Sequence, residues 1–364
     1  MPESVIPICD LHCDTATNLL IGDSLLDPRL QVNLPAMKKA GIGLQVFACY
    51  LPPAIPKGKA FAMISDFIAR FKEVLTRHEE DLQLCLDREQ VMACQKQGKI
   101  AALLAVENGN AIEADLGKLE ALYRMGVRLM TIVHAESNEW VISSNDARPP
   151  FPGLSDFGRE VIQAMNDLGM IIDLSHAHDR AVEAVLRISK HPVIASHSCA
   201  RALCDTARNL PDDLIAGIAA GDGLIGLNIY PGFLDGAFNR LIAEQAGDLF
   251  TELGRLERSA GMDLARIGRL FPDFSAKFQT AMAGHSIPLE RYYDHILYLS
   301  ELVGAEFIAF GSDFDGVPLL PQGVKDCSVF GDIRAGLFER DYSRDEVEAI
   351  CWNNFMRVLG AVCG

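Results

Sequence analysis

The sequence predicts an eight-stranded parallel (β/α)8 barrel, and three observations support this fold class. Eight short, almost continuously apolar runs are spaced along the 364 residues. Apolar residues at three- and four-residue intervals fill the segments between these runs, as in amphipathic helices. Strands that are apolar on both faces are typical of parallel sheets covered by helices. An open doubly wound sheet is less favoured, because no GxGxxG follows the first run and no loop resembles a P-loop. We therefore expect one barrel domain over residues 1–364.

The expected strands alternate with segments of helical periodicity. Residues 115–126 (DLGKLEALYRMG) and 179–190 (DRAVEAVLRISK) each show helical spacing before the next apolar run. Gly126 and Gly169 follow helical segments, where a residue with positive φ commonly ends a helix. The eight expected strands cover residues 5–9, 44–51, 101–107, 128–134, 170–176, 192–198, 224–230 and 307–313.

One connection is longer than the others. Residues 233–286 separate the seventh expected strand from the helix that leads to the eighth. They show helical periodicity and contain no strand-like run. Because long insertions after a strand are often lids or partner surfaces, we expect a helical insertion on the rim of the barrel.

Composition limits the classes of partner and the compartment. The formal net charge of -16 argues against binding to nucleic acid, and it disfavours anionic membrane surfaces. The first residues contain no basic leader, and no run of about 18 apolar residues occurs. Ten cysteines are scattered without a CxxC pair, which fits reduced thiols better than a disulfide framework. We therefore expect a cytoplasmic protein with no membrane or nucleic-acid partner.

Polar residues gather at one end of the expected strands. The first strand is followed by DLHCDT, in which His12 and Asp14 share a face because side chains alternate along an extended chain. On this stretch alone, an Asp that holds a histidine tautomer explains the pair as well as metal binding does. In a barrel, however, the carboxyl ends of all the strands meet at one mouth. At these ends the sequence places His12, Asp14, Glu107, His134, His176, His197 and Asp313.

This set of side chains favours two metal ions over one. Three of these histidines and the three carboxylates already exceed the needs of a single tetrahedral zinc, whereas two ions about 3.5 to 4 Å apart would use them. Glu107, from a strand between the others, is the expected bridge. His12 and Asp14 are assigned to one ion, and His176 and His197 to the other. Two divalent ions would nearly neutralise the carboxylates and a bridging hydroxide, so the site can be buried.

The remaining histidines lie away from these strand ends, with one exception. His178 stands two residues past His176, so it is either a further group at the mouth or a hydrogen-bonding residue at a helix start. No metal ligand is expected among His78, His191, His285 and His295.

Seven motifs follow one another along the chain: DLHCDT, VENGN, TIVHAESN, GLSDFGREVIQAMNDLGMIIDLSH, PVIASHS, ARNLPDDL and GSDFDGV. In this order they resemble the membrane (renal) dipeptidase family, zinc dipeptidases of peptidase family M19 that are related to the amidohydrolase barrels. The likeness runs along nearly the whole chain apart from the insertion. Seven motifs in order are far more specific than any single one.

The resemblance implies a binuclear zinc site that agrees with the assignment above. One ion is held by His12, Asp14 and Glu107, and the other by Glu107, His176 and His197. Glu107 and a water or hydroxide bridge the two Zn²⁺ ions. In this reading the hydroxide attacks the peptide carbonyl.

The resemblance also implies roles for three further residues. His134 contacts the scissile carbonyl, Arg208 holds the free carboxylate of the substrate, and Asp313 is the acid/base. Without the resemblance, Arg208 would be interpreted as a surface or helix-capping arginine before NLPDD. The implied activity is hydrolysis of dipeptides with a free C-terminal carboxylate, including those with a C-terminal D-residue such as L-Ala-D-Ala. The resemblance and the helical insertion together also suggest a homodimer.

The chain departs from the family pattern at few places. Cys13 replaces a polar residue, Asn108 replaces a glycine after the Glu, and the chain ends RVLGAVCG without a long apolar tail, so a lipid anchor is not carried over.

Two alternative functions stay open. One is another binuclear amidohydrolase acting on cyclic amides, lactones or N-acyl amino acids. The other is a noncatalytic metal-binding or partner-binding scaffold, which the presence of Asp313 as an extra general base disfavours.

Overall fold

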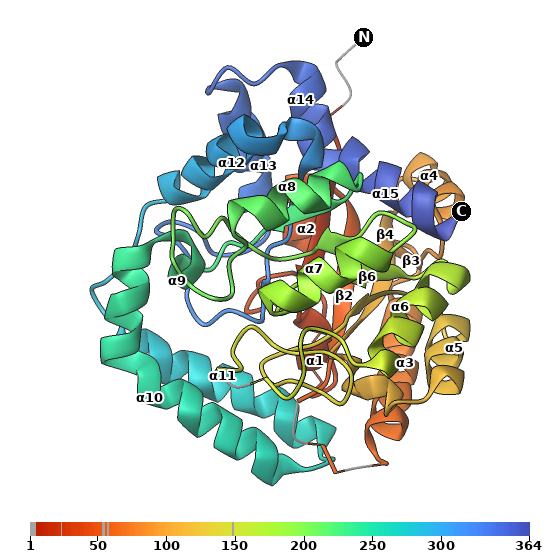
Figure 1. The fold of residues 1–364 in the computed structure, drawn as a ribbon. Coiled ribbons are helices and arrows are strands. Elements are labelled where there is room, and N and C mark those ends of the chain that lie inside the picture. Colours follow the sequence, from red (N-terminus) through yellow and green to blue (C-terminus); the bar gives the residue numbers. More distant parts are fainter. Residues whose placement is uncertain (1–4, 23, 53–54, 57, 148) are drawn as a thin grey trace.

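The computed structural model describes residues 5–22, 24–52, 55–56, 58–147 and 149–364, and these form a closed parallel barrel surrounded by helices (Figure 1). Eight strands of this part of the chain close the ring in the order β1-β2-β4-β5-β6-β7-β8-β9, and β9 pairs with β1. The predicted (β/α)8 fold class is therefore confirmed. The barrel strands are β1 (Ile8–Cys13), β2 (Ile42–Tyr50), β4 (Ile100–Glu107), β5 (Val127–Thr131), β6 (Ile171–Asp173), β7 (Ile194–Ala195), β8 (Leu224–Leu227) and β9 (Ile308–Phe310).

One short strand was not predicted, and several strands end at other residues than predicted. β3 (Leu82–Leu84) pairs with the start of β4, while β5 pairs with the end of β4. Three residues with the pattern LQL are too short to show a strand periodicity. The expected strand 192–198 is observed only as β7, because its polar end leaves the ladder and turns into the mouth. The first strand begins and ends later than predicted, because it spans β1 instead of residues 5–9. Val5, at the start of the predicted run, is exposed.

Helices cover the outside of the barrel and connect its strands (Figure 1). Gly169 ends α6 in the left-handed region at φ 75°, and Gly126 has φ 95°, so both glycines adopt the positive φ that was expected of them. In the described residues the α-helices are α1 (Thr15–Leu19), α2 (Leu34–Ala40), α3 (Ala60–Arg77), α4 (Arg88–Lys96), α5 (Leu116–Arg124), α6 (Asp156–Leu168), α7 (Asp179–Ile188), α8 (Asp212–Ala220), α9 (Pro231–Leu234), α10 (Gly236–Ala260), α11 (Leu264–Ala281), α12 (Glu290–Val303), α13 (Val329–Phe338), α14 (Arg344–Glu348) and α15 (Asn354–Cys363). Shorter turns of other helix types are η1 (Gly109–Ile112), η2 (Ala305–Phe307) and the π-helical η3 (Ala349–Asn353). Across this part of the chain, no helix has the length and apolar character that crossing a bilayer requires.

Alternate residues of the strands fill the inside of the barrel. Ala101, Leu103 and Ala105 of β4 belong to one buried cluster with matching alternate residues of the other strands. The same alternation continues to Glu107, the last residue of β4, so its side chain enters the barrel at the carboxyl end. The sheet geometry thus places a carboxylate at the centre of the mouth.

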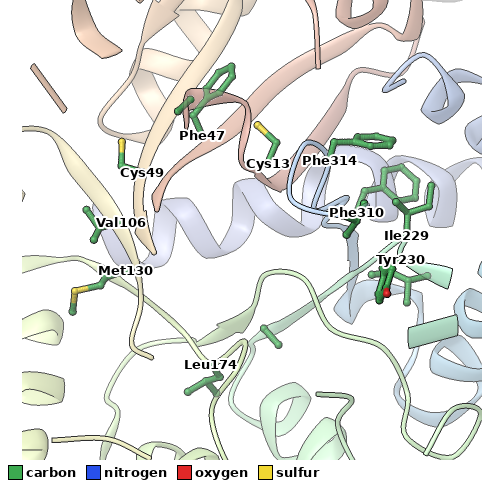
Figure 2. Close-up of a cluster of buried hydrophobic side chains, with 14 of the residues drawn as sticks. Cys13, Phe47, Cys49, Val106, Met130, Leu174, Ile229, Tyr230, Phe310 and Phe314 are labelled. Carbon is green, nitrogen blue, oxygen red and sulfur yellow. The ribbon is translucent and has the colours of Figure 1, made fainter. Parts of the chain in front are cut away.

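The opposite face of each strand packs against the helices. Phe47 and Cys49 of β2, Val106 of β4 and Met130 of β5 belong to this outer layer, part of which is shown in Figure 2. The rings of Phe310 and Phe330 stack with centroids 4.9 Å apart, which joins β9 to α13. This double covering explains why the strand sequences are apolar at nearly every position.

The expected helical insertion follows β8, the seventh strand of the barrel. It consists of α10 and α11, which run as a long antiparallel pair along one side of the molecule, at the lower left in Figure 1. We call this pair, residues 236–281, the helical hairpin. The backbone of α11 at Gly268 lies against α1, because a Cβ added there would be 3.1 Å from the carbonyl oxygen of Thr17. The hairpin is therefore fastened next to the end of β1.

Gly311 allows a close approach between strands inside the barrel. A Cβ at this position would lie 1.7 Å from the carbonyl oxygen of Ser196. We expect Gly311→Ala to lower the free energy of unfolding by about 3 kcal/mol, because the backbone after β7 would have to move. Urea unfolding followed by circular dichroism measures this change. Gly247→Ala on α10, where nothing lies within 4 Å, is the matched control and should instead stabilise by about 0.5–1 kcal/mol. Equal stability of the two variants would contradict the clash.

Candidate metal centre

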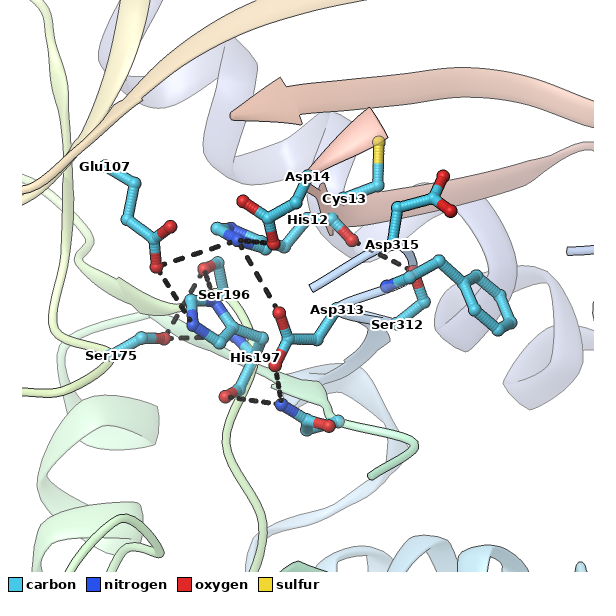
Figure 3. Close-up of polar contacts among 12 residues, drawn as sticks. His12, Cys13, Asp14, Glu107, Ser175, Ser196, His197, Ser312, Asp313 and Asp315 are labelled. Carbon is cyan, nitrogen blue, oxygen red and sulfur yellow. Dashed lines mark hydrogen bonds and ion pairs between the residues drawn. The ribbon is translucent and has the colours of Figure 1, made fainter. Parts of the chain in front are cut away.

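Six segments that are distant in sequence bring ionisable side chains together at the carboxyl mouth of the barrel. His12 lies at the end of β1, Glu107 ends β4, and His197 and Asp313 follow β7 and β9. Figure 3 shows these side chains pointing toward one another around His12. His12 Nε2 is 3.6 Å from Asp14 Oδ2, 3.7 Å from Glu107 Oε1 and 3.9 Å from Asp313 Oδ1. All seven residues predicted from the strand ends are in this cluster or at its edge.

Glu107 is the residue common to both halves of the cluster. Besides His12, its Oε1 lies 3.3 Å from His176 Nε2 and 3.6 Å from His197 Nε2. His134 Nε2 is 3.9 Å from the same oxygen. Most of these separations are longer than hydrogen bonds but close to the spacing of roughly 3 to 4 Å between ligands that share one ion. Glu107 therefore lies between the two groups of side chains, where a residue that bridges two ions would stand.

The pKa values show how strongly these groups perturb one another. Burial raises the pKa of Glu107 well above its usual range, and it raises the pKa of Asp313 to about 7. Burial lowers the pKa of His12, but the carboxylates of Glu107, Asp14 and Asp313 outweigh this effect and raise it to about 10. Burial also lowers the pKa of His176 and His197 well below the usual value. Neutral imidazoles beside crowded carboxylates are a donor set suited to divalent cations.

Buried nitrogens without hydrogen-bond partners provide a further test of whether a metal fits. Among the described residues, His12 has no hydrogen-bond partner at either ring nitrogen, although its side chain is fully buried. An unpaired buried polar atom is costly unless another group binds it. The residues present therefore fit metal ions at this mouth.

The tautomer of His197 is fixed from beneath the cluster. Asp173 accepts hydrogen bonds from Thr131 Oγ1, from the backbone amides of Ser175 and Ser196, and from Ser196 Oγ at 2.6 Å. Because the Ser196 hydroxyl gives its proton to Asp173, it must accept from His197 Nδ1, which lies 2.7 Å away. His197 Nε2 is then unprotonated and lies 3.0 Å from His176 Nε2. A lone pair is thus presented to the cluster.

A second buried aspartate supports the opposite side of the mouth. Asp10 accepts from the Ser312 backbone amide at 2.8 Å, from Ser312 Oγ at 2.7 Å and from Gln45 Nε2 at 2.9 Å. Ser312 Oγ also lies 2.9 Å from the carbonyl oxygen of His12. These bonds tie β1, β2 and the segment after β9 together directly below His12.

Two residues of the cluster hold strained backbone conformations. His176 has φ 67° and Asp313 has φ 62°, in the left-handed region that non-glycine residues seldom adopt. Such positions cost about 1–3 kcal/mol each and occur preferentially at functional sites. Asp313 is held there by its amide, which donates to the His12 carbonyl, and by Asn228 Nδ2, which donates to Asp313 Oδ2 at 2.8 Å. Asp313 Oδ1 is left facing His12.

Arg208 is a buried cation beside the cluster. Its guanidinium donates to Ser198 Oγ and to the His197 carbonyl, each at 3.0 Å, and it lies 5.5 Å from the centroid of the Phe233 ring. Within the part of the chain that the structure describes, no carboxylate pairs with it and its Nε has no partner. Burial lowers the pKa of Arg208. A buried guanidinium with neutral partners favours an incoming anion.

The structure distinguishes the two readings of His178. Its side chain caps α7 by accepting from the Arg180 backbone amide at 3.1 Å. It therefore has the helix-start role that the sequence left open. His134 is different, because its ring packs 4.3 Å from His176 and 4.8 Å from Tyr50 at the cluster.

Five residues that support the cluster were not predicted from the sequence: Asp10, Asp173, Ser196, Asn228 and Ser312. Asp10, Asp173 and Asn228 interrupt apolar runs, in PICDLH, IIDLSH and LIGLNIY, whereas Ser196 and Ser312 stand where an apolar run ends, in VIASHS and IAFGSD. A polar residue in or next to an apolar run is a signal that can be read from the sequence, because a buried polar side chain in a strand needs a hydrogen-bond partner. The sequence could not identify the partners, because they come from neighbouring strands.

A cavity of about 650 Å³ opens above the cluster. Asp14, Glu107, His134, His176 and Asp313 line its floor, and residues of the helical hairpin line its wall. Arg208 is not in the wall, whereas Tyr230 and Phe233 beside it are. The cavity is large enough for a small molecule whose reacting group lies on the cluster.

A closed parallel barrel with four histidines and three carboxylates at its carboxyl mouth belongs structurally to the class of (β/α)8 proteins built like metal-dependent hydrolases. The sequence model of the membrane dipeptidase family, peptidase family M19, matches residues 3–363. The chain therefore belongs to this family, and the family resemblance of its motifs is confirmed.

Sequence identity to individual relatives is low. Dipeptidase 3 of Mus musculus is 28% identical over 368 residues, which cover 98% of this chain and 64% of the mouse protein. The chain thus spans less than two thirds of the length of that relative.

Solved structures share the fold. The metallo peptidase of family M19 called dipeptidase AC superimposes with a TM-score of 0.80 at 24% identity, covering 99% of this chain and 100% of that one. A metallo peptidase from Rhodobacter sphaeroides, liganded with a phosphinate mimic of the dipeptide L-Ala-D-Ala, has a TM-score of 0.79 at 22% identity with the same coverage.

Proposed function

We propose that this chain is a zinc-dependent dipeptidase that hydrolyses dipeptides with a free C-terminal carboxylate. Family membership and the cluster of histidines and carboxylates support a metallopeptidase. The observation that carries the substrate class is the buried guanidinium of Arg208, which contacts the carbonyl of His197 and has no anionic partner among the described residues. A substrate carboxylate would supply that partner in a bidentate pair.

In this proposal two Zn²⁺ ions occupy the mouth. His12, Asp14 and Glu107 would hold one ion, and Glu107, His176 and His197 would hold the other. Bound zinc would lower the pKa of water and polarise a carbonyl, which are the two contributions that peptide hydrolysis requires. The unpartnered His12 nitrogens and the fixed tautomer of His197 support this assignment.

His134 and Asp313 are proposed to act on the substrate. Burial lowers the pKa of His134 to about 3, so its imidazole is neutral and can donate one hydrogen bond to the scissile carbonyl oxygen. With Oδ2 held by Asn228, Asp313 Oδ1 would take a proton from the attacking water and return it to the leaving amine. A carboxylate in this position can hold the proton between the two transfers.

Arg208 is proposed to select the free carboxylate, and its access is controlled by neighbouring aromatic residues. Tyr230 and Phe233 line the cavity, and the Phe233 ring lies beside the guanidinium. A carboxylate can reach Arg208 from the cavity only if the side chain of Tyr230 or Phe233 moves aside. Binding of the substrate carboxylate is therefore expected to displace Phe233 or Tyr230.

We extend the proposal to dipeptides with a C-terminal D-residue. The Rhodobacter sphaeroides structure, whose fold this chain shares, carries a mimic of L-Ala-D-Ala, which supports this extension. Comparing the turnover of L-Ala-L-Ala with that of L-Ala-D-Ala tests it, and complete rejection of the D-isomer would remove it.

A cytoplasmic location is also proposed, because none of the ten cysteines forms a disulfide in the described structure. A homodimer stays a prediction.

Removal of the Ser196 hydroxyl should weaken metal binding. In Ser196→Ala the imidazole of His197 loses the acceptor for Nδ1–H, so the lone pair at Nε2 is no longer fixed. We expect zinc affinity, measured by competition with a chromophoric chelator, to fall about 10- to 100-fold. Ser65→Ala on α3 is a matched control, since that hydroxyl bonds only to the Phe61 carbonyl in the described structure. Equal affinities for the two variants would exclude the positioning role.

Replacement of the proposed acid/base should separate catalysis from metal binding. Asp313→Asn keeps the shape and the Asn228 contact but cannot accept a proton. We expect turnover to fall about a hundredfold or more, with zinc content by elemental analysis unchanged. Undiminished turnover would refute the acid/base role. A loss of zinc would show that Asp313 is instead a ligand, which its distance of 3.9 Å from His12 permits.

The carboxylate-binding role of Arg208 is tested by the ratio of two substrates. Wild-type enzyme should prefer L-Ala-L-Ala over its C-terminal amide by about a hundredfold in kcat/KM, and Arg208→Gln should abolish most of that preference. A ratio measured within one preparation is independent of the fraction of folded enzyme. An amide that wild-type enzyme hydrolyses as fast as the acid would instead favour a general amidohydrolase.

A further inference from the structure

The helical hairpin contributes an apolar wall to the cavity. Six apolar residues of the hairpin line the cavity: Phe250, Leu253, Ile267, Leu270, Phe271 and Phe274. Phe274 packs inside the hairpin against Phe278, but Leu270 and Phe271 are only partly buried and Phe250 is 42% exposed. These side chains leave apolar surface open toward the cavity, and a bound apolar group would cover it.

This wall lies across the mouth from Arg208. The hairpin rests on α1, which directly follows Asp14, and α10 reaches Tyr50 at the end of β2. Arg208 follows β7, and β2 and β7 stand on opposite sides of the eight-strand ring. A dipeptide whose carboxylate lies at Arg208 and whose peptide bond lies over the cluster must therefore direct its first residue toward the hairpin.

Glu257 provides a charged group at the same wall. Phe250, Leu253 and Glu257 are spaced so that they share one face of α10, and all three line the cavity. Glu257 Oε1 accepts from the Tyr50 hydroxyl at 3.2 Å, and the Tyr50 ring packs against His134. In the described structure no cation pairs with Glu257, because its neighbour Arg258 is bonded to Glu136. A cationic group of a ligand would complete this site.

We propose that the helical hairpin binds the first residue of the substrate: its apolar wall holds a bulky apolar side chain and Glu257 pairs with the free ammonium group. This inference rests on the proposed dipeptidase function and narrows it to dipeptides that begin with a large apolar residue. It also distinguishes dipeptides from N-acyl amino acids, which have no ammonium group at that position. Burial raises the pKa of Glu257 to about 7, and a neighbouring ammonium group would favour its ionised form.

The apolar wall is tested by a ratio of two dipeptides. Wild-type holoenzyme should have a kcat/KM for L-Phe-L-Ala at least about tenfold above that for L-Ala-L-Ala, because a benzyl group is removed from water. Phe271→Ala should reduce that ratio severalfold. Phe338→Ala, a change of an exposed aromatic residue on α13 outside the cavity wall, should leave the ratio as in the wild type.

The role of Glu257 is tested with a blocked amine. Wild-type enzyme should prefer L-Phe-L-Ala over N-acetyl-L-Phe-L-Ala by about tenfold or more, and Glu257→Gln should remove most of this preference through a higher KM for the free dipeptide. Glu252→Gln on the same helix, where the carboxylate pairs with Lys277, is the matched control and should retain it.

The possible failures are distinguishable. If purified holoenzyme hydrolyses L-Ala-L-Ala as well as L-Phe-L-Ala, or if Glu257→Gln retains the preference for the free amine, the inference is wrong while the dipeptidase function stands. If no dipeptide of the panel is hydrolysed by zinc-loaded enzyme, the proposed function itself fails.

Discussion

Two buried aspartates, Asp10 and Asp173, impose the constraint on which the mouth of this barrel depends. A carboxylate without solvent contact must have its oxygens filled by donors, and here the donors come from adjacent strands. Asp173 joins β5, β6 and the segment after β7, while Asp10 joins β1, β2 and the segment after β9. The same serines that satisfy these carboxylates contact His197 and His12. The requirement to satisfy buried charge thus also sets the positions of the histidines above it.

This support explains how strained residues persist at the site. His176 and Asp313 both have positive φ, and Asn108, directly after Glu107, has φ 97°. Glycine adopts positive φ at little cost, whereas an asparagine there is strained. Asn108 offsets the strain locally, because its side chain donates to the Leu51 carbonyl and accepts from the Asn110 amide. Rigid strand ends below these residues hold them in conformations that an unsupported loop would not retain.

The sequence predicted the features that repeat and missed those that depend on single contacts. Apolar runs identified the eight barrel strands, and polar residues at their ends identified the histidines and carboxylates, because both follow from the geometry of a parallel barrel. The strand β3 has only three residues, so it has no readable period. The pairing of Asp173 with Ser196 depends on strand register, which a one-dimensional pattern does not contain. Helical periodicity likewise indicated the insertion but not which of its faces meets the cavity.

The cluster at the strand ends and the helical hairpin form different parts of the cavity wall, so substrate specificity and catalysis depend on different residues. The cluster is built from strand ends whose positions are fixed by interior packing, so a substitution there disturbs both the buried aspartates and the ligands they support. The hairpin, by contrast, is a single connection after β8 and reaches the cavity through side chains such as Phe271 and Glu257. Changes on that face alter which first residue fits while leaving the support of His12 and His197 unchanged. Recognition can therefore vary on the hairpin at little cost to the chemistry at the barrel mouth, since the two depend on different contacts.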